Sequence, residues 1–201
     1  ALLEQKFYDD PIVYKKTTRY QHLVMTHNSN IDDTRLYING NTQFSSLDEG
    51  RYHDFLVHPV MAVAPSIKHV LVLGGGDGLA LREIIKYAAV ESVTLVDLDP
   101  EMIDIATNNQ LLASLNNHAF QHAKVNVASI NTYVAGSKQA IYMREVGHKT
   151  TEGEWVASVD VFNIDADQFL KKQPAQKWDA VVIDLPDPSS IALSKLSSKQ
   201  F

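Results

Sequence analysis

Four aspartates, each placed after an apolar run, are the residues best suited to chemistry in this chain. They are Asp77, Asp97, Asp165 and Asp184. The runs before them are typical of buried parallel strands, whose carboxyl ends meet at one edge of a sheet. We therefore expect the four carboxylates to gather at that edge. Such a group can bind cations, accept hydrogen bonds from hydroxyl and amino groups, or take up a proton.

A glycine-rich turn separates the apolar run Val70–Leu73 from a helix-forming stretch. Glycines there let a ligand approach the backbone closely. A dinucleotide-binding turn needs a further glycine where Leu79 stands, and the Gly-Lys-Ser/Thr of a P-loop is absent. An acid in the turn disfavours phosphate and favours a cationic ligand. The pattern G-x-G-x-G, followed by an acidic end to the next strand, is typical of folds that bind S-adenosyl compounds. A tight turn without a ligand is the alternative on these residues alone. The turn comprises Gly74, Gly75, Gly76, Asp77 and Gly78.

The other acids separate into binding and structural candidates. Asp97 lies about 20 residues past the glycines, where such sheets place an acid for ribose hydroxyls. Asp99 precedes Pro100, so we predict that it caps a helix. Asp184 and Asp187 are three residues apart in a proline-containing loop and could converge on one cation, although Asp and Pro are also ordinary turn residues.

The composition narrows the class of protein. The chain has 201 residues, of which 45% are hydrophobic and 21% charged, as in soluble globular proteins. Its net charge of −6 argues against nucleic acid as a main partner. With no cysteine there are neither disulfides nor thiolate metal sites, and we expect no metal site and no prosthetic group. No apolar run approaches the length of a membrane span and no signal peptide is visible, so we expect a cytoplasmic location, with a membrane segment outside this stretch left open.

The hydrophobic patterns predict an α/β protein with two parts. Residues 1–46 read as a small antiparallel β domain, with strand-like runs on both sides of Asn39-Gly40. Residues 47–201 read as a Rossmann-like, nucleoside-binding domain with a parallel sheet. In it we expect helices over Leu47–Ala64 and Glu101–Leu115. The segment of about 116–157 is long for a connection and is expected to hold an inserted hairpin.

Taken in order, the segments GGGDG, VDLD, NIDA and DLPDP resemble those of spermidine synthase and the wider aminopropyltransferases of polyamine biosynthesis. Upstream, Tyr20-Gln21, Gln43 and the run from Asp48 to Asp54 fit the same family. The resemblance implies a small N-terminal β domain followed by a Rossmann-like, class I methyltransferase-like domain. It also implies transfer of an aminopropyl group from decarboxylated S-adenosylmethionine, the donor substrate, to an amine such as putrescine.

The resemblance also implies roles on the donor side. Asp77 would hold the propylamine nitrogen, with Gln43 and His53 nearby. Asp97 would bind the ribose hydroxyls, and Asp165 the adenine amino group. The glycines of the turn, Gln21 and Ala166 would complete the donor site.

On the acceptor side, the resemblance implies a base and two helpers. An alkylamine has a pKa near that of lysine, about 10.4, so it reaches the site protonated and not nucleophilic. Asp184 would bind that nitrogen and accept its proton as general base. Tyr52 would orient the amine by hydrogen bonding, and Asp187 would add negative charge.

Two alternatives remain open at this stage. An S-adenosylmethionine-dependent methyltransferase must accept the carboxylate of the intact donor, which Asp77 would repel. A non-catalytic nucleoside- or polyamine-binding domain of a larger protein is the second. Leu185 and Pro186 stand between the two acids of the acceptor motif, where typical spermidine synthases carry small polar residues, and make that wall more apolar.

The sequence ends at Phe201, soon after the fourth strand, where the family continues with further strands and helices. We therefore expect an open sheet edge that either drives self-association, as in a homodimer, or is followed by a disordered tail after Pro188. Little transferase activity is expected of this stretch.

Overall fold

A computed structural model describes residues 3–63, 66–122, 125–132, 148–149, 155–172 and 178–186. The chain forms two compact units, Ala1–His53 and Asp54–Phe201. The boundary between the units falls within helix α1 (Glu49–Val63) rather than before it. In the part of the chain described, none of the helices combines the length and the apolarity that crossing a bilayer requires.

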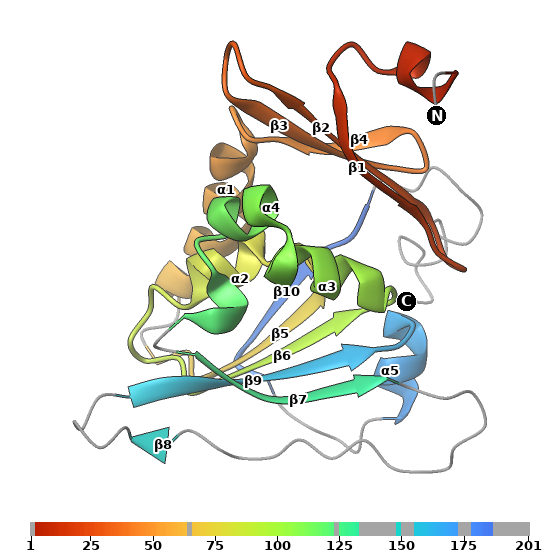
Figure 1. Cartoon of the computed structure of the whole chain (residues 1–201). Coiled ribbons are helices and arrows are strands. Elements are labelled where there is room, and N and C mark those ends of the chain that lie inside the picture. The colour runs from red at the N-terminus through yellow and green to blue at the C-terminus, as the bar shows by residue number, and fades with distance from the viewer. Residues whose placement is uncertain are drawn as a thin grey trace. The chain divides into compact units, whose positions relative to one another are not determined.

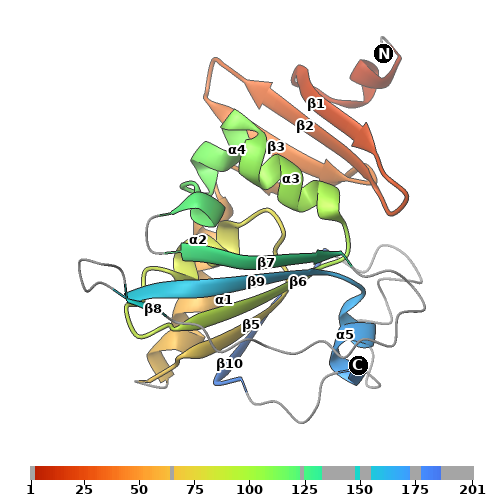
Figure 2. The ribbon, with the colours of Figure 1, turned by 60° about the horizontal axis from the view of Figure 1, so that its bottom comes forward.

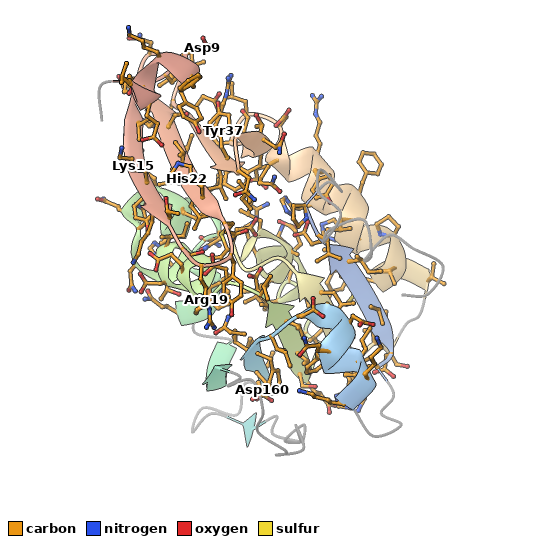
Figure 3. All side chains as sticks on the ribbon, turned by 90° about the vertical axis from the view of Figure 1, so that its right-hand side faces the viewer. Asp9, Lys15, Arg19, His22, Tyr37 and Asp160 are labelled. Carbon is orange, nitrogen blue, oxygen red and sulfur yellow. The ribbon has the colours of Figure 1, made fainter. Side chains whose placement is uncertain are left out.

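The first unit is a four-stranded antiparallel sheet in the order β1-β2-β3-β4. Asn39 and Gly40 have φ of 53° and 83°, the left-handed pair of a tight hairpin turn, so the predicted hairpin between β3 and β4 is confirmed. Glu4 of the short helix η1 contacts two residues of this sheet, Lys15 Nζ at 2.5 Å and His22 Nε2 at 2.7 Å. Figure 3 labels Lys15 and His22 on their neighbouring strands. The elements are η1 (Glu4–Phe7), β1 (Ile12–Thr17), β2 (His22–Asn28), β3 (Asp33–Ile38) and β4 (Asn41–Ser45).

The second unit is built on a six-stranded sheet whose main path runs β10-β5-β6-β9-β7, with all neighbours on that path parallel (Figure 1). β5 lies inside the sheet and its four apolar residues are buried, as the continuous apolar run predicts. The α/β Rossmann-like fold expected from the sequence is confirmed. The strands are β5 (His69–Gly74), β6 (Ser92–Asp97), β7 (Val125–Thr132), β8 (His148–Lys149), β9 (Trp155–Asn163) and β10 (Ala180–Asp184).

The helix predicted over Glu101–Leu115 is wrong as a single element, because the chain breaks at Asn109. Asn109 has extended backbone angles, and its side chain accepts hydrogen bonds from Leu111 N (3.1 Å) and Leu112 N (3.3 Å), which starts a new helix. Asp99 caps the first of the two helices by accepting from Glu101 N at 3.1 Å, as predicted. The helices after α1 are α2 (Leu79–Ile84), α3 (Pro100–Asn108), α4 (Gln110–Leu115), η2 (Ala119–Gln121) and α5 (Ala166–Lys172).

The long segment before β9 holds a strand that the sequence patterns did not indicate. β7 runs parallel to β9 at the end of the sheet path (Figure 2). β8 pairs antiparallel with the start of β9, through His148 with Val156 and Lys149 with Trp155. The predicted hairpin piece at 140–146 lies outside the described residues.

A hydrophobic cluster packs α5 against the carboxyl end of the sheet. The Phe162 and Phe169 rings lie 5.2 Å apart, and Trp178 continues the stack at 6.3 Å from Phe169. Because α5 follows directly after β9 at the end to which the strands point, this packing fixes the loop between them (Figure 1). The buried members of the cluster are Leu71, Leu73, Val96, Phe162, Ile164, Ala166 and Phe169.

Candidate functional site

The glycine turn begins where β5 lies against the end of β10. Gly74 has φ of 84°, and a Cβ on it would lie 1.9 Å from the backbone oxygen of Asp184. Gly75, with φ of 68°, donates its N–H to that same oxygen at 3.0 Å. Only glycine combines this conformation with this approach. The turn therefore holds the backbone of Asp184 directly against the end of β5.

Gly76 makes the equivalent connection to β6. Its N–H donates to Asp97 Oδ2 at 3.0 Å, and a Cβ there would lie 2.5 Å from the same oxygen. Asp97 Oδ1 accepts from Asp99 N at 2.9 Å. Burial raises the pKa of Asp97 to about 6, although these two backbone hydrogen bonds oppose the rise, and the charges of Asp99 and Asp184 add to it. Asp97 is thus a desolvated carboxylate with acidic neighbours at the carboxyl edge.

Asp77 and Gly78 complete the turn and lead into α2. Asp77 is half-buried, and its Oδ1 accepts from Leu79 N at 2.9 Å. Gly78 has φ of 83°, and a Cβ on it would lie 2.9 Å from Phe120 and 3.0 Å from Asn116 Nδ2. The carboxylate of Asp77 therefore accepts a hydrogen bond at the start of α2, in the turn at the carboxyl edge of the sheet.

Asp165 has a structural role that the sequence analysis did not foresee. Its Oδ1 accepts from Gln168 N at 2.9 Å and its backbone oxygen from Phe169 N at 2.8 Å, so it caps α5. Ala166, the first residue of α5, is buried. Asp165 is half-buried.

The structure brings Asp97 and Asp184 to the same glycine turn, through Gly76 and Gly75 respectively. Asp184 ends β10 and is half-buried. Asp187, expected to act beside it, lies outside the described residues.

Four predicted site residues belong to the first unit. Gln21 directly precedes β2, and Gln43 lies in β4, where its Nε2 contacts Asn41 O at 3.4 Å. Tyr52 and His53 lie in α1, with their rings edge to face at 5.0 Å. Tyr52 is 53% exposed, whereas His53 is 3% exposed.

The buried imidazole of His53 is held within its own helix. Its Nδ1 lies 2.9 Å from both the backbone oxygen and Oε2 of Glu49. Both neighbours are acceptors, so Nδ1 is the nitrogen that donates.

Two buried asparagines support the carboxyl edge, and sequence reasoning missed both. Asn163 ends β9 and donates from Nδ2 to Asp97 O at 3.3 Å, which ties β9 to the end of β6. Asn116, fully buried, donates from Nδ2 to Asp77 O at 2.8 Å. Neutral amides carry no charge pattern: Asn163 appeared only as part of the NIDA segment, and only the position of Asn116 just after a predicted helix could have drawn attention to it.

A second polar cluster lies on the helices, where Asp54, His58 and Glu83 each place one potential ligand atom within 4.8 Å of the others. Glu83 is already met by His58 Nε2 at 3.0 Å, by Arg82 Nε at 2.8 Å and by Lys86. Burial alone would raise the pKa of Glu83, but the hydrogen bonds from Lys86 and Arg82 outweigh it and lower that pKa. These side chains are an ion-pair network that holds α2 against α1.

Comparison with known proteins bears on this geometry. Residues 49–142 match the family model described as the spermine/spermidine synthase domain. A polyamine aminopropyltransferase of Oceanobacillus iheyensis is 38% identical over 98% of this chain and 31% of the relative. The polyamine aminopropyltransferase 2 of Ralstonia nicotianae is 40% identical over 98% of this chain and 32% of the relative.

The predicted resemblance to the aminopropyltransferases is confirmed. That of Bacillus cereus, polyamine aminopropyltransferase 2, is 37% identical over 94% of this chain and 41% of the relative. The chain thus spans less than half the length of each of these three aminopropyltransferases.

Solved structures agree on the fold. A spermidine synthase in complex with the transition state analogue AdoDATO superposes with a TM-score of 0.67 at 22% identity, covering 93% of this chain and 50% of that one. The spermidine synthase of Thermotoga maritima superposes with a TM-score of 0.63 at 21% identity, covering 86% of this chain and 47% of that one.

Proposed function

We propose that this chain supplies the donor-binding half, and the general base, of an aminopropyltransferase similar to spermidine synthase. The reaction moves an aminopropyl group from decarboxylated S-adenosylmethionine to an amine such as putrescine. The observation that carries the proposal is the gathering of Asp97 and Asp184 around the one glycine turn that also contains Asp77. Relatives named polyamine aminopropyltransferases, aligned along 98% of this chain, support it.

The donor side suits a nucleoside whose side chain is cationic. Asp97, held by two backbone amides, has the acceptor oxygens that ribose hydroxyls require. Asp77 offers a carboxylate to the propylamine nitrogen, and the intact donor would bring its own carboxylate to the same place. Asp165 receives the adenine amino group. In this proposal Gln21, Gln43, His53 and Ala166 complete the donor site.

The acceptor side needs a base rather than a nucleophile on the protein. Asp184 takes a proton from the acceptor ammonium group, and the freed nitrogen pair attacks the carbon next to the sulfonium. The C–N bond forms as the C–S bond breaks, and the C–S electron pair leaves with sulfur as a neutral thioether, methylthioadenosine. Tyr52 and Asp187 orient the acceptor and add negative charge. Alignment of nitrogen, carbon and sulfur supplies much of the rate.

A binding titration tests the donor assignment. Decarboxylated S-adenosylmethionine should bind at least about tenfold more tightly than S-adenosylmethionine, because one carboxylate–carboxylate repulsion at about 4 Å is worth roughly 1 to 4 kcal/mol, and about 1.4 kcal/mol is a factor of ten. Asp77→Asn should narrow that ratio. Asp104→Asn, the same charge change on the exposed face of α3, should leave it unchanged. Equal affinity for both donors in the unmodified chain would favour a methyltransferase and overturn the proposal.

Turnover by a version of the protein that spans its relatives' full length tests the acceptor side. Asp184→Asn should remove most turnover and leave methylthioadenosine binding nearly unchanged. If the variant keeps its turnover, Asp184 is not the base. If it loses nucleoside binding instead, Asp184 belongs to the donor side. The cytoplasmic location and the self-association stay predictions, to be checked by fractionation and by sedimentation.

A further inference from the structure

Three consecutive residues of the glycine turn are each tied to a different part of the second unit. Gly75 N–H donates to Asp184 O at the end of β10, and Gly76 N–H donates to Asp97 Oδ2 at the end of β6. The backbone oxygen of Asp77 accepts from Asn116 Nδ2 at 2.8 Å. The first two anchors come from strands of the sheet. The third is Asn116, in the loop that follows α4.

Asn116 uses its whole carboxamide. Besides Asp77 O, Nδ2 donates to Ala106 O at 2.8 Å, and Oδ1 accepts from Ala119 N at 3.3 Å. The side chain is fully buried. Among side chains, only the carboxamides of Asn and Gln combine two N–H donors with a carbonyl acceptor in one planar group. Asp, Ser or Ala therefore cannot make all three bonds.

The backbone that follows Asn116 is strained, and the surrounding contacts hold it in this conformation. Asn117 and His118 follow it with φ of 54° and 52°, two successive non-glycine residues in the left-handed region. His118 N is fixed to Ala113 O at 2.7 Å. On the opposite side Gly78 has no side chain, and a Cβ there would lie 3.0 Å from Asn116 Nδ2. Strain of this kind persists where surrounding contacts over-determine a conformation, as they do here.

We propose that Asn116 is a positioning residue for the donor: it fixes the peptide of Asp77 and so sets where the Asp77 carboxylate meets the donor nitrogen. This inference rests on the proposed function of the turn. Asn116 touches no substrate in this scheme. It acts through Asp77, and its loss leaves two carbonyl oxygens, the part-buried Asp77 O and the buried Ala106 O, without this donor.

The experiment compares Asn116→Ala with Asn109→Ala. Asn109 is also a hydrogen-bonding asparagine, but its side chain caps the start of α4 by accepting from Leu111 N and Leu112 N. For each variant we would measure unfolding by urea and the dissociation constants of decarboxylated S-adenosylmethionine and methylthioadenosine. Methylthioadenosine lacks the aminopropyl nitrogen and so reports on the nucleoside part of the site alone.

Asn116→Ala should weaken the decarboxylated donor by about tenfold, the effect of one lost buried hydrogen bond, and methylthioadenosine by much less. Asn109→Ala should lower stability and leave the ratio of the two affinities unchanged. If Asn116→Ala does not fold, Asn116→Ser, which keeps one small donor, is measured in its place. An unchanged ratio in whichever Asn116 variant folds overturns the inference, whereas failure of the unmodified chain to bind either nucleoside overturns the proposed function instead.

Discussion

Two acidic side chains of the second unit, Asp97 and Glu83, are held in opposite ways. Burial, with the charges of neighbouring carboxylates, raises the pKa of Asp97 to about 6, although hydrogen bonds from two backbone amides oppose the rise. Burial would also raise the pKa of Glu83, but hydrogen bonds from Lys86 and Arg82 reverse the effect. Cationic side chains balance the charge of Glu83, which joins two helices, whereas Asp97 at the carboxyl edge has backbone N–H donors but acidic neighbours, and further donors would stabilise its charge. A ligand rich in O–H and N–H donors meets that need.

The largest effect should come from removing Glu83. Glu83→Ala leaves Arg82, Lys86 and His58 without their shared carboxylate, and we expect a loss of about 3 kcal/mol of unfolding free energy, measured by urea denaturation. Glu91→Ala is the matched control, because its partner Lys68 is 53% exposed and such surface pairs are worth under about 1 kcal/mol. Equal losses in the two variants would contradict the contrast between a supporting and an exposed ion pair.

Gly76→Ala tests the other acid of the comparison, Asp97. A Cβ at this position would lie 2.5 Å from Asp97 Oδ2, so the carboxylate must move, and we expect about 2 kcal/mol of destabilisation together with weaker methylthioadenosine binding. Gly50→Ala is the control, since a Cβ there meets nothing within 4 Å and alanine favours a helix. Wild-type nucleoside affinity in Gly76→Ala would show that the position of the Asp97 carboxylate does not matter for donor binding.

The raised pKa of Asp97 predicts a pH dependence of stability. In the folded chain Asp97 keeps its proton up to about pH 6, whereas in the unfolded chain it loses it near 3.8. The folded state therefore binds more protons between those values, and stability should fall as the pH rises from about 4 to 6. The drop should be about 1 to 2 kcal/mol larger in the unmodified chain than in Asp97→Asn.

Donor binding should show the complementary trend. Ribose hydroxyls donate best to the ionised carboxylate, so methylthioadenosine affinity should increase as the pH rises through about 6. Parallel stability curves for the two proteins, or a flat affinity profile, would contradict the assignment.

The smallest effect should follow Asp54→Asn. Asp54 Oδ1 lies 3.2 Å from His58 Nε2, but its side chain is 58% exposed, so we expect under about 1 kcal/mol in the same denaturation assay. A loss as large as that of Glu83→Ala would mean that the three side chains act as a single unit, with Asp54 as important as the buried acid.

Sequence patterns predicted those parts of the molecule whose cause is local. The apolar run Val70–Leu73, the Asn39-Gly40 turn and the cap at Asp99 each carry their own signal, and each is observed. The break at Asn109 was missed because helix-forming residues stand on both sides of it. The strand β7 was missed because its pairing with β9 depends on residues distant in the sequence.

The site shows the same limit. The acids at the strand ends follow from the rule that parallel strands share a carboxyl edge. The cap of Asp165 on α5 is a local contact with an amide three residues further on, and the sequence analysis missed it because it considered Asp165 only as a ligand-binding group. That Asn116 reaches Asp77 across 39 residues follows from tertiary packing alone. Glu83 joins His58 of another helix for the same reason, and spacing within one helix could only have paired His58 with Asp54.

The position of β10 has a consequence for how the chain reaches its native state. β10 pairs with β5, and Asp179 just before it accepts from Lys68 N at 2.9 Å and His69 N at 2.8 Å, across 111 and 110 residues. Contacts of such long range form slowly, whereas the hairpins of the first unit need only short loops. During synthesis β5 emerges long before its partner and stays an open edge, able to pair with another chain. The risk of aggregation in this topology therefore depends more on how fast β10 pairs with β5 than on the stability of the folded chain.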